Sequence, residues 1–220
     1  FFSLANVLVD LKEFDEALNC YQKTIELNPN IVSAHNNLGL LYRDMNNFNK
    51  AIDCYKKTIE IKPDHYSAHH NLGQIYKELG QFEKSIKSHE NAVKYEPHNL
   101  MNYHFLSELK KEILTPDLKV KINKILEDKK TKKINLAYGN FVLSKYERKN
   151  KNFERELLHL IKAHENFYNS YKIKFDHGNK FAFDDVHQIN QGAKVNKSNV
   201  KKEFKVSPIF IVGVPRCGST

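Results

Sequence analysis

The residues best suited to chemistry stand together in the segment 207–220. Pro208 opens an apolar run that meets Gly213, and the loop after it contains Arg216 before the run Cys217, Gly218, Ser219 and Thr220. An apolar run that meets a glycine predicts a buried strand entering a tight turn. Backbone amides in such a loop, followed by the first turn of a helix, attract anions because N–H groups and the positive end of the helix dipole converge there. The segment therefore predicts a phosphate-binding loop.

The spacing separates this loop from that of the nucleotide triphosphatases. Gly213 and Gly218 are separated by four residues, as in the glycine loop of those enzymes, but Ser219 stands where the lysine belongs. That lysine is needed on the terminal phosphates, so its absence argues against hydrolysis of ATP or GTP. The basic group lies instead inside the loop, at Arg216.

Pro208–Gly213 followed by Pro215–Thr220 resembles the 5′-phosphosulfate loop of sulfotransferases, of the type found in tyrosylprotein sulfotransferases and in bacterial proteins that fuse such a domain to tetratricopeptide repeats. The segment departs from the usual pattern at Cys217, which replaces a serine, and at Ser219, which replaces a threonine and keeps the hydroxyl. Backbone amides supply much of the anion binding in such loops, and any residue provides them.

The resemblance implies an enzyme that transfers a sulfonate group from 3′-phosphoadenosine 5′-phosphosulfate to an acceptor hydroxyl, with protein tyrosine as one candidate. It assigns donor binding to Arg216, Cys217, Gly218, Ser219 and Thr220, and Arg216 would stabilise charge on the bridging oxygen. The general base and the 3′-phosphate site are expected downstream, so the 220 residues contain no catalytic residue and are expected to be inactive alone. Two alternatives stay open: a non-catalytic peptide-binding or scaffold module, and a nucleotide triphosphatase or kinase with an aberrant loop.

The first half of the chain repeats itself every 34 residues. Pro29, Pro63 and Pro97 share this spacing, and so do Ala5, Gly39 and Gly73, as well as Tyr21, Tyr55 and His89. The pattern resembles the tetratricopeptide repeat over residues 1–99, with three units of which the first is incomplete. It predicts an all-α solenoid of stacked helix pairs, in which small residues allow close helix approach. In the family such pairs form a superhelix with a concave groove, where a protein or peptide partner is expected.

Asn37 and Asn71 recur at one position of the repeat and resemble the asparagine ladder in the repeats of O-linked N-acetylglucosamine transferase. An asparagine side chain both donates to and accepts from a peptide backbone, so these two are candidate peptide-binding residues. Repeat 1 has Ser3 at this position, and Asn is frequent throughout the chain, so an ordinary polar surface stays the alternative.

After Pro97 the period degenerates while the helical pattern continues. Helices are expected over 100–114, 118–130, 134–149 and 152–171, and residues 100–171 resemble the irregular connector of the fused sulfotransferases. Residues 172–206 are interpreted as a linker with one short helix near 181–189. Residues 207–220 would be the first strand and phosphate loop of the sulfotransferase domain.

Charge is distributed unevenly along the chain. Residues 1–99 contain 11 Lys or Arg against 13 Asp or Glu, and residues 100–220 contain 24 against 13. The basic half would attract a polyanionic nucleotide, although most of these lysines are expected to be a solvated surface; no nucleic-acid partner is expected. No apolar run is long enough to span a membrane.

The cysteines and histidines favour no metal or disulfide site. Cys20 and Cys54 lie one repeat apart and are expected to pack as small apolar residues, and the odd count of three favours a reducing, cytoplasmic location. The histidine groups lack the spacing and the partner ligands of a metal site; they are His65, His69 and His70, and His177 and His187. Phe1 begins inside a helical pattern, so both ends look cut.

Overall fold

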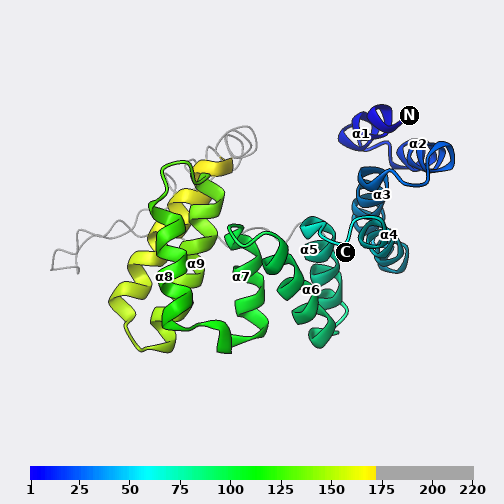
Figure 1. Cartoon of the computed structure of the whole chain (residues 1–220). Helices are drawn as coiled ribbons and strands as arrows, with labels where there is room; N and C mark the ends of the chain where they lie inside the picture. Colours follow the sequence, from blue (N-terminus) through cyan, green and yellow to red (C-terminus); the bar gives the residue numbers. More distant parts are fainter. Residues whose placement is uncertain (172–220) are drawn as a thin grey trace, which may run out of the picture. The chain divides into compact units, whose positions relative to one another are not determined.

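The structure is a computed structural model, and it describes residues 1–171. This part of the chain is built from α-helices joined by short turns (Figure 1). The helices are α1 (Phe2–Asp10), α2 (Phe14–Leu27), α3 (Val32–Asp44), α4 (Phe48–Ile61), α5 (Tyr66–Glu78), α6 (Phe82–Tyr95), α7 (Leu100–Leu109), α8 (Pro116–Glu127), α9 (Lys133–Lys149) and a helix over residues 153–171. The predicted helical solenoid is confirmed, whereas the predicted strand and phosphate loop of 207–220 lie outside the described residues.

The turn inside each of the first three helix pairs is built in the same way. Lys12, Asn46 and Gly80 lie 34 residues apart and have φ angles of 64°, 58° and 71°. In each turn the next amide reaches back across the helix end, as in the bonds from Asn47 N to Tyr42 O and from Gln81 N to Tyr76 O, both 2.7 Å. This is the Schellman termination, which needs a left-handed residue after the helix. Glycine adopts that conformation without steric cost, but only the third turn has one.

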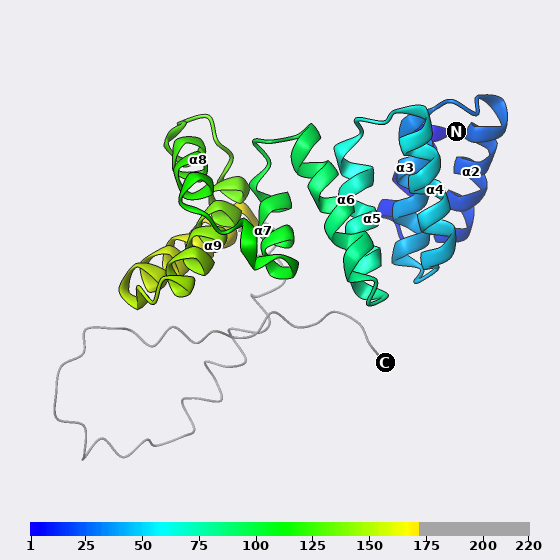
Figure 2. The same cartoon turned by 60° about the horizontal axis from the view of Figure 1, so that its bottom comes forward.

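Within each of the first three pairs the two helices pack side by side (Figure 2). A Cβ atom added to Gly39 would come within 2.7 Å of the ring of Tyr55, and one added to Gly73 would come within 2.6 Å of the ring of His89. The 34-residue spacing of small and large residues thus places a ring directly on the backbone of the preceding helix. Cys20 and Cys54 pack at the edge of the same apolar core.

The buried apolar residues form two clusters. One extends from Ala5 in α1 to Ile75 in α5, and the other joins α7, α8 and α9 around Leu100 and Leu143. Buried polar side chains of α6 lie between them: Ser85 donates to the carbonyl of Gly73 at 2.6 Å, and His89 is fully buried. The junction between the two clusters is therefore more polar than either cluster.

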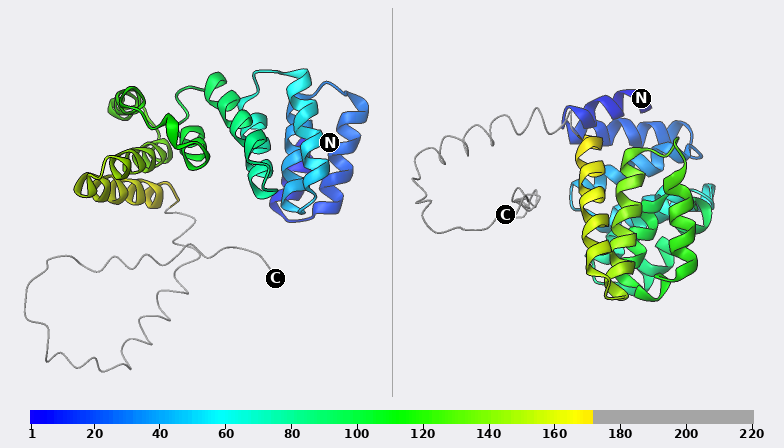
Figure 3. Two further views of the ribbon diagram at one scale, coloured as in Figure 1. Left: turned by 90° about the horizontal axis from the view of Figure 1, so that it is seen from below. Right: turned by 90° about the vertical axis from the view of Figure 1, so that its left-hand side faces the viewer.

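Two of the later helices depart from the predicted boundaries, because the helix expected over 118–130 is α8, Pro116–Glu127, and the helix at 100 is shorter than expected. The helix expected over 100–114 ends at Leu109 and is followed by a short 3-10 turn, Lys111–Ile113, which brings Leu114 into the second cluster. Helix α8 begins at Pro116 and is capped by Thr115, whose Oγ1 accepts a hydrogen bond from Leu118 N at 3.2 Å. Helix 153–171 lies beside α9 (Figure 3), held by ring contacts and by the bond between His159 Nδ1 and Asn140 Oδ1 at 2.9 Å. Among residues 1–171, no helix is both long and apolar enough to cross a bilayer.

Candidate functional site

The first helices of the pairs present a row of polar and aromatic side chains, which we call the first-helix face. It consists of Asn6 in α1, Asn37 in α3, Asn71 and Lys77 in α5, Phe105 and Glu108 in α7, and Lys145 in α9. The 34-residue period places these helices in succession, because each unit begins with the helix that carries the small crossing residue.

At the start of this face the amides are linked to one another. Asn37 Nδ2 donates to Asn6 Oδ1 at 3.0 Å, and the hydroxyl of Tyr21 donates to the same oxygen at 2.6 Å. Asn36 Nδ2 donates to Asn37 Oδ1 at 3.3 Å. Asn37 is half-buried, and part of its hydrogen-bonding capacity stays free, since an amide offers two donors and two acceptor lone pairs.

Asn71 has a different environment from Asn37. It is 8% exposed, and its side chain makes no hydrogen bond to another residue of the described range. The structure therefore places both predicted asparagines on first helices, but it does not bring them into contact. Their role in peptide binding stays a prediction.

Further along the face, Glu108 joins three helices through ion pairs. Its carboxylate lies 2.5 Å from Lys77 Nζ of α5, 3.3 Å from His104 Nε2 and 3.5 Å from Lys145 Nζ of α9. Burial alone would raise the pKa of Glu108, but the hydrogen bonds from His104 and Lys77 and the charge of Lys145 lower it well below its usual range. Burial lowers the pKa of Lys145 despite this carboxylate. The carboxylate of Glu108 is thus ionised at neutral pH, beside the amines of Lys77 and Lys145.

Rings from α7, α9 and helix 153–171 adjoin this ion-pair network. Phe105 lies 5.3 Å from His104 and 6.2 Å from Tyr138 between ring centroids, and Phe141 lies 5.5 Å from His104 and 6.4 Å from Phe167. Sequence reasoning missed this group. One signal was present, because Phe105 stands 34 residues after Asn71 and so replaces the next asparagine of the row.

Three buried polar side chains lie directly behind the rings. His70 Nδ1 lies 2.8 Å from Asn102 Oδ1, and His89 stacks on Phe105 at 5.8 Å. Within the described residues, neither ring nitrogen of His89 has a hydrogen-bond partner. Asn102 Nδ2 has none either. Burial lowers the pKa of His70 to about 4, and burial together with the charges of His70 and Lys77 lowers that of His89 to about 3.

The other histidines of the repeats have structural partners. His35 Nε2 lies 2.8 Å from the carbonyl oxygen of Pro29, and His69 Nε2 lies 2.9 Å from that of Pro63, so both fasten the turn between repeats. Across residues 1–171, no three His, Cys, Asp or Glu side chains are grouped to hold a metal ion. His177 and His187 lie outside the described residues.

The helix pairs and this side-chain row define an α-helical repeat protein. Family models described as tetratricopeptide repeats match residues 32–65 and 54–87, and one described as a TPR repeat matches residues 5–45. The chain therefore contains tetratricopeptide repeats, as the 34-residue period predicted.

Two solved structures of MamA agree with this fold. A crystal structure of MamA is 18% identical, with a TM-score of 0.55, over 78% of this chain and 99% of that one. A second MamA structure is 18% identical, with a TM-score of 0.53, over 79% and 92%. The first TPR of Spaghetti (RPAP3), bound to the HSP90 peptide SRMEEVD, is 19% identical with a TM-score of 0.48, over 52% and 90%. None of the curated proteins matches the chain.

These comparisons correct the prediction of function. The chain was predicted to belong to a sulfotransferase, but the matching models and structures indicate repeats alone and no catalytic family, so that prediction and the assignment as an enzyme are wrong. The error has a physical cause. Anion affinity in a phosphate loop comes from the strand and helix that orient its amides, and a few residues of glycine-loop type do not specify that surrounding fold.

The residues that were assigned to the donor, Arg216, Cys217, Gly218, Ser219 and Thr220, lie outside the described residues. The prediction that they bind 3′-phosphoadenosine 5′-phosphosulfate is untested, and so are the boundaries of the linker at 172–206.

Proposed function

We propose that this chain is a non-catalytic interaction module that binds an extended peptide along the first-helix face. Stacked helical repeats expose long surfaces whose side chains recur at regular intervals, which suits a partner with a regular backbone. An extended peptide offers such a backbone, with one N–H and one C=O group per residue.

The observation that carries this proposal is that the side-chain amide of Asn71 makes no hydrogen bond within residues 1–171. Asn71 is 8% exposed, and none of residues 1–171 accepts a hydrogen bond from its side chain or donates one to it. Its amide atoms are not among the polar atoms that are sealed from solvent, so both remain available to a ligand. A peptide backbone can satisfy both because it supplies a donor and an acceptor together. The spare donor of Asn37 offers the same contact one repeat earlier.

The far end of the face supports the same function. The half-buried rings around Phe105 would cover an apolar side chain of the peptide, and the Glu108 network places charges of both signs beside them. Aromatic side chains with an adjacent charge are typical of the residues that dominate binding at interfaces. The amides would then supply affinity through contacts with the peptide backbone, and the rings would supply specificity through contacts with its side chains.

The test begins with selection of peptides from a random displayed library against the whole chain. The selected peptide is titrated by calorimetry into wild type and into the variant Asn37→Ala/Asn71→Ala. Each lost backbone hydrogen bond is worth about 1 kcal/mol, so we expect affinity to fall at least about tenfold.

The matched control is Asn19→Ala/Asn49→Ala, which removes two exposed asparagines of α2 and α4. This control should bind the peptide within about twofold of wild type. Equal affinity of both double variants would show that the peptide does not use the first-helix face.

A further inference from the structure

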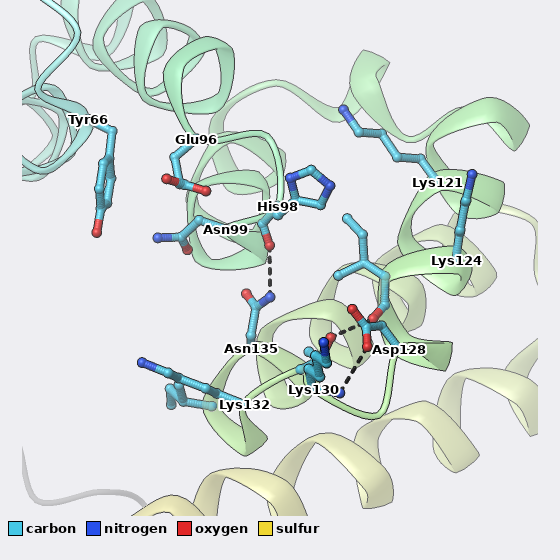
Figure 4. A pocket seen from close by; sticks show the side chains of 13 residues that line it. Tyr66, Glu96, His98, Asn99, Lys121, Lys124, Asp128, Lys130, Lys132 and Asn135 are labelled. Carbon is cyan, nitrogen blue, oxygen red and sulfur yellow. Dashed lines mark hydrogen bonds between the residues drawn. The ribbon is translucent and has the colours of Figure 1, made fainter.

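A cavity with both polar and apolar lining residues shares no residue with the first-helix face. It has a volume of about 830 Å³ and is bounded by the start of α5, the turn between α6 and α7, α8, and the first turn of α9 (Figure 4). This volume is far more than one small anion requires and is typical of sites for larger ligands.

The walls of this cavity are held by their own hydrogen bonds. Asn135 Nδ2 donates to the carbonyl of His98 at 2.8 Å and Asn135 Oδ1 accepts from Leu100 N at 2.7 Å, which joins α9 to the α6–α7 turn. On the other side Asp128 Oδ1 accepts from Lys130 N at 2.9 Å, and Thr131 Oγ1 donates to the carbonyl of Ile125 at 2.7 Å. The cavity is therefore preformed, which lowers the cost of ordering it on binding.

The lining is rich in lysine amines that the fold does not use. Lys121, Lys124, Lys130 and Lys132 line it, and we call this site the lysine cleft. Lys121 Nζ donates to the hydroxyl of Tyr103 at 2.6 Å, but the other three amines have no ion pair or hydrogen bond with any residue of 1–171. Elsewhere several lysines are paired, as Lys119 is with Glu147 at 2.6 Å.

The placement of these charges favours a ligand with several negative groups. Lys121 and Lys124 extend from α8, whereas Lys130 and Lys132 belong to the turn before α9, across the cleft (Figure 4). Asp128 is already occupied as the acceptor of its turn. The N-cap of α9, Lys132, provides no side-chain cap, so the positive end of this helix dipole adds to the field of the amines.

We propose that the lysine cleft binds an acidic peptide segment of a partner protein. Glu96 also lines the cleft, and a peptide can donate backbone N–H groups to its carboxylate, whereas the backbone of a phosphodiester chain has no such donors. The residues that line the cleft include no arginine, whose planar fork is the usual means of binding phosphate at two points. Lysine amines act as flexible point charges, which suits carboxylates spaced along a mobile segment.

The test measures the fluorescence anisotropy of a labelled hexaglutamate peptide with the whole chain at low salt. The variant Lys124→Ala/Lys132→Ala should bind it about tenfold more weakly than wild type, because two of the unpaired charges are removed. Lys124→Arg/Lys132→Arg keeps the charges and should stay within about twofold of wild type. Affinity should also fall as salt rises through the physiological range.

The matched control, Lys56→Ala/Lys87→Ala, removes the same net charge from exposed positions of α4 and α6. It should change affinity by less than about twofold, since distant exposed charges are screened. Equal loss in the two alanine variants would overturn the proposal, and so would binding of hexaglutamine as tight as that of hexaglutamate. Tripolyphosphate or single-stranded DNA that displaced the peptide at lower charge concentration would replace the peptide with a phosphate ligand and overturn it as well.

Discussion

Replacing His89 by phenylalanine should remove a large part of the acid sensitivity of this fold. His89 is fully buried in α6, where its ring stacks on Phe105 and meets His70 edge-on at 5.4 Å. Neither of its nitrogens has a hydrogen-bond partner within the described residues. Burial and the nearby charges of His70 and Lys77 lower its pKa to about 3, and Glu108 opposes them.

The sign and size of the effect follow from this pKa. An unfolded histidine has a pKa of about 6.5, so the unfolded chain takes up the proton first as the pH falls. The stability due to the neutral ring is complete above about pH 7 and is lost progressively between about pH 6.5 and pH 3. At about pH 5 the free energy of unfolding has fallen by roughly 2 kcal/mol, because about 1.36 kcal/mol is lost for each pH unit below about pH 6.5. His70, with a pKa of about 4, should contribute a loss of similar size.

A six-membered ring fits this position, because Tyr55 lies equally close to Gly39 in the preceding repeat. His89→Phe should therefore fold, and it also removes a buried N–H that had no acceptor, which should raise the free energy of unfolding near neutral pH by about 1 kcal/mol. Between about pH 7.5 and pH 5, the free energy of unfolding should fall by about 2 kcal/mol less than in wild type.

Urea unfolding followed by circular dichroism at the two pH values measures this difference directly. His98→Ala is the control, because His98 is exposed on the α6–α7 turn, and it should show the same fall with pH as wild type. If His89→Phe and wild type lost the same free energy on acidification, the buried neutral histidine would not be the source of acid sensitivity, and the reasoning would be refuted.

Two further predictions concern positions that recur in the repeats, and both are measured by urea unfolding. Tyr21→Phe removes a hydroxyl bonded to Asn6 and should lower the free energy of unfolding by about 1 kcal/mol. Tyr55→Phe removes a buried hydroxyl that has no partner in residues 1–171, so it should leave the free energy of unfolding unchanged or raise it. Equal losses in the two variants would contradict this. Lys12→Gly should stabilise the chain by about 0.5–1 kcal/mol, because lysine adopts a left-handed φ of 64° there. Gly80→Ala should destabilise the chain by about 1 kcal/mol. A loss of stability in Lys12→Gly would refute this account of the turns.

Most of the repeat architecture could be predicted from the sequence. Small and large residues at a fixed spacing of 34 specify two amphipathic helices per unit, and Gly39 and Gly73 mark the crossings that the structure contains. The helix at 100 was predicted too long, because its end depends on burying Leu114 in a cluster built from α8 and α9. That requirement arises in three dimensions and leaves no local signal near Leu109.

The candidate site was predicted only in part. Asn37 and Asn71 were found because the period repeats them, but the network around Glu108 joins residues 31 and 37 positions away, at Lys77 and Lys145. Such pairs depend on how α5, α7 and α9 cross, and the period has degenerated by the time the chain reaches α9. The sulfotransferase prediction was wrong for the opposite reason, since a local motif was interpreted without a fold around it.

The most direct test of the peptide-binding account is a chemical-shift map of the isotope-labelled chain with a selected peptide. The account predicts that the side-chain amide signals of Asn37 and Asn71 shift, together with backbone signals of α3, α5 and α7 near Phe105. Shifts confined to the second helices α2, α4 and α6, with both asparagine signals unmoved, would contradict it.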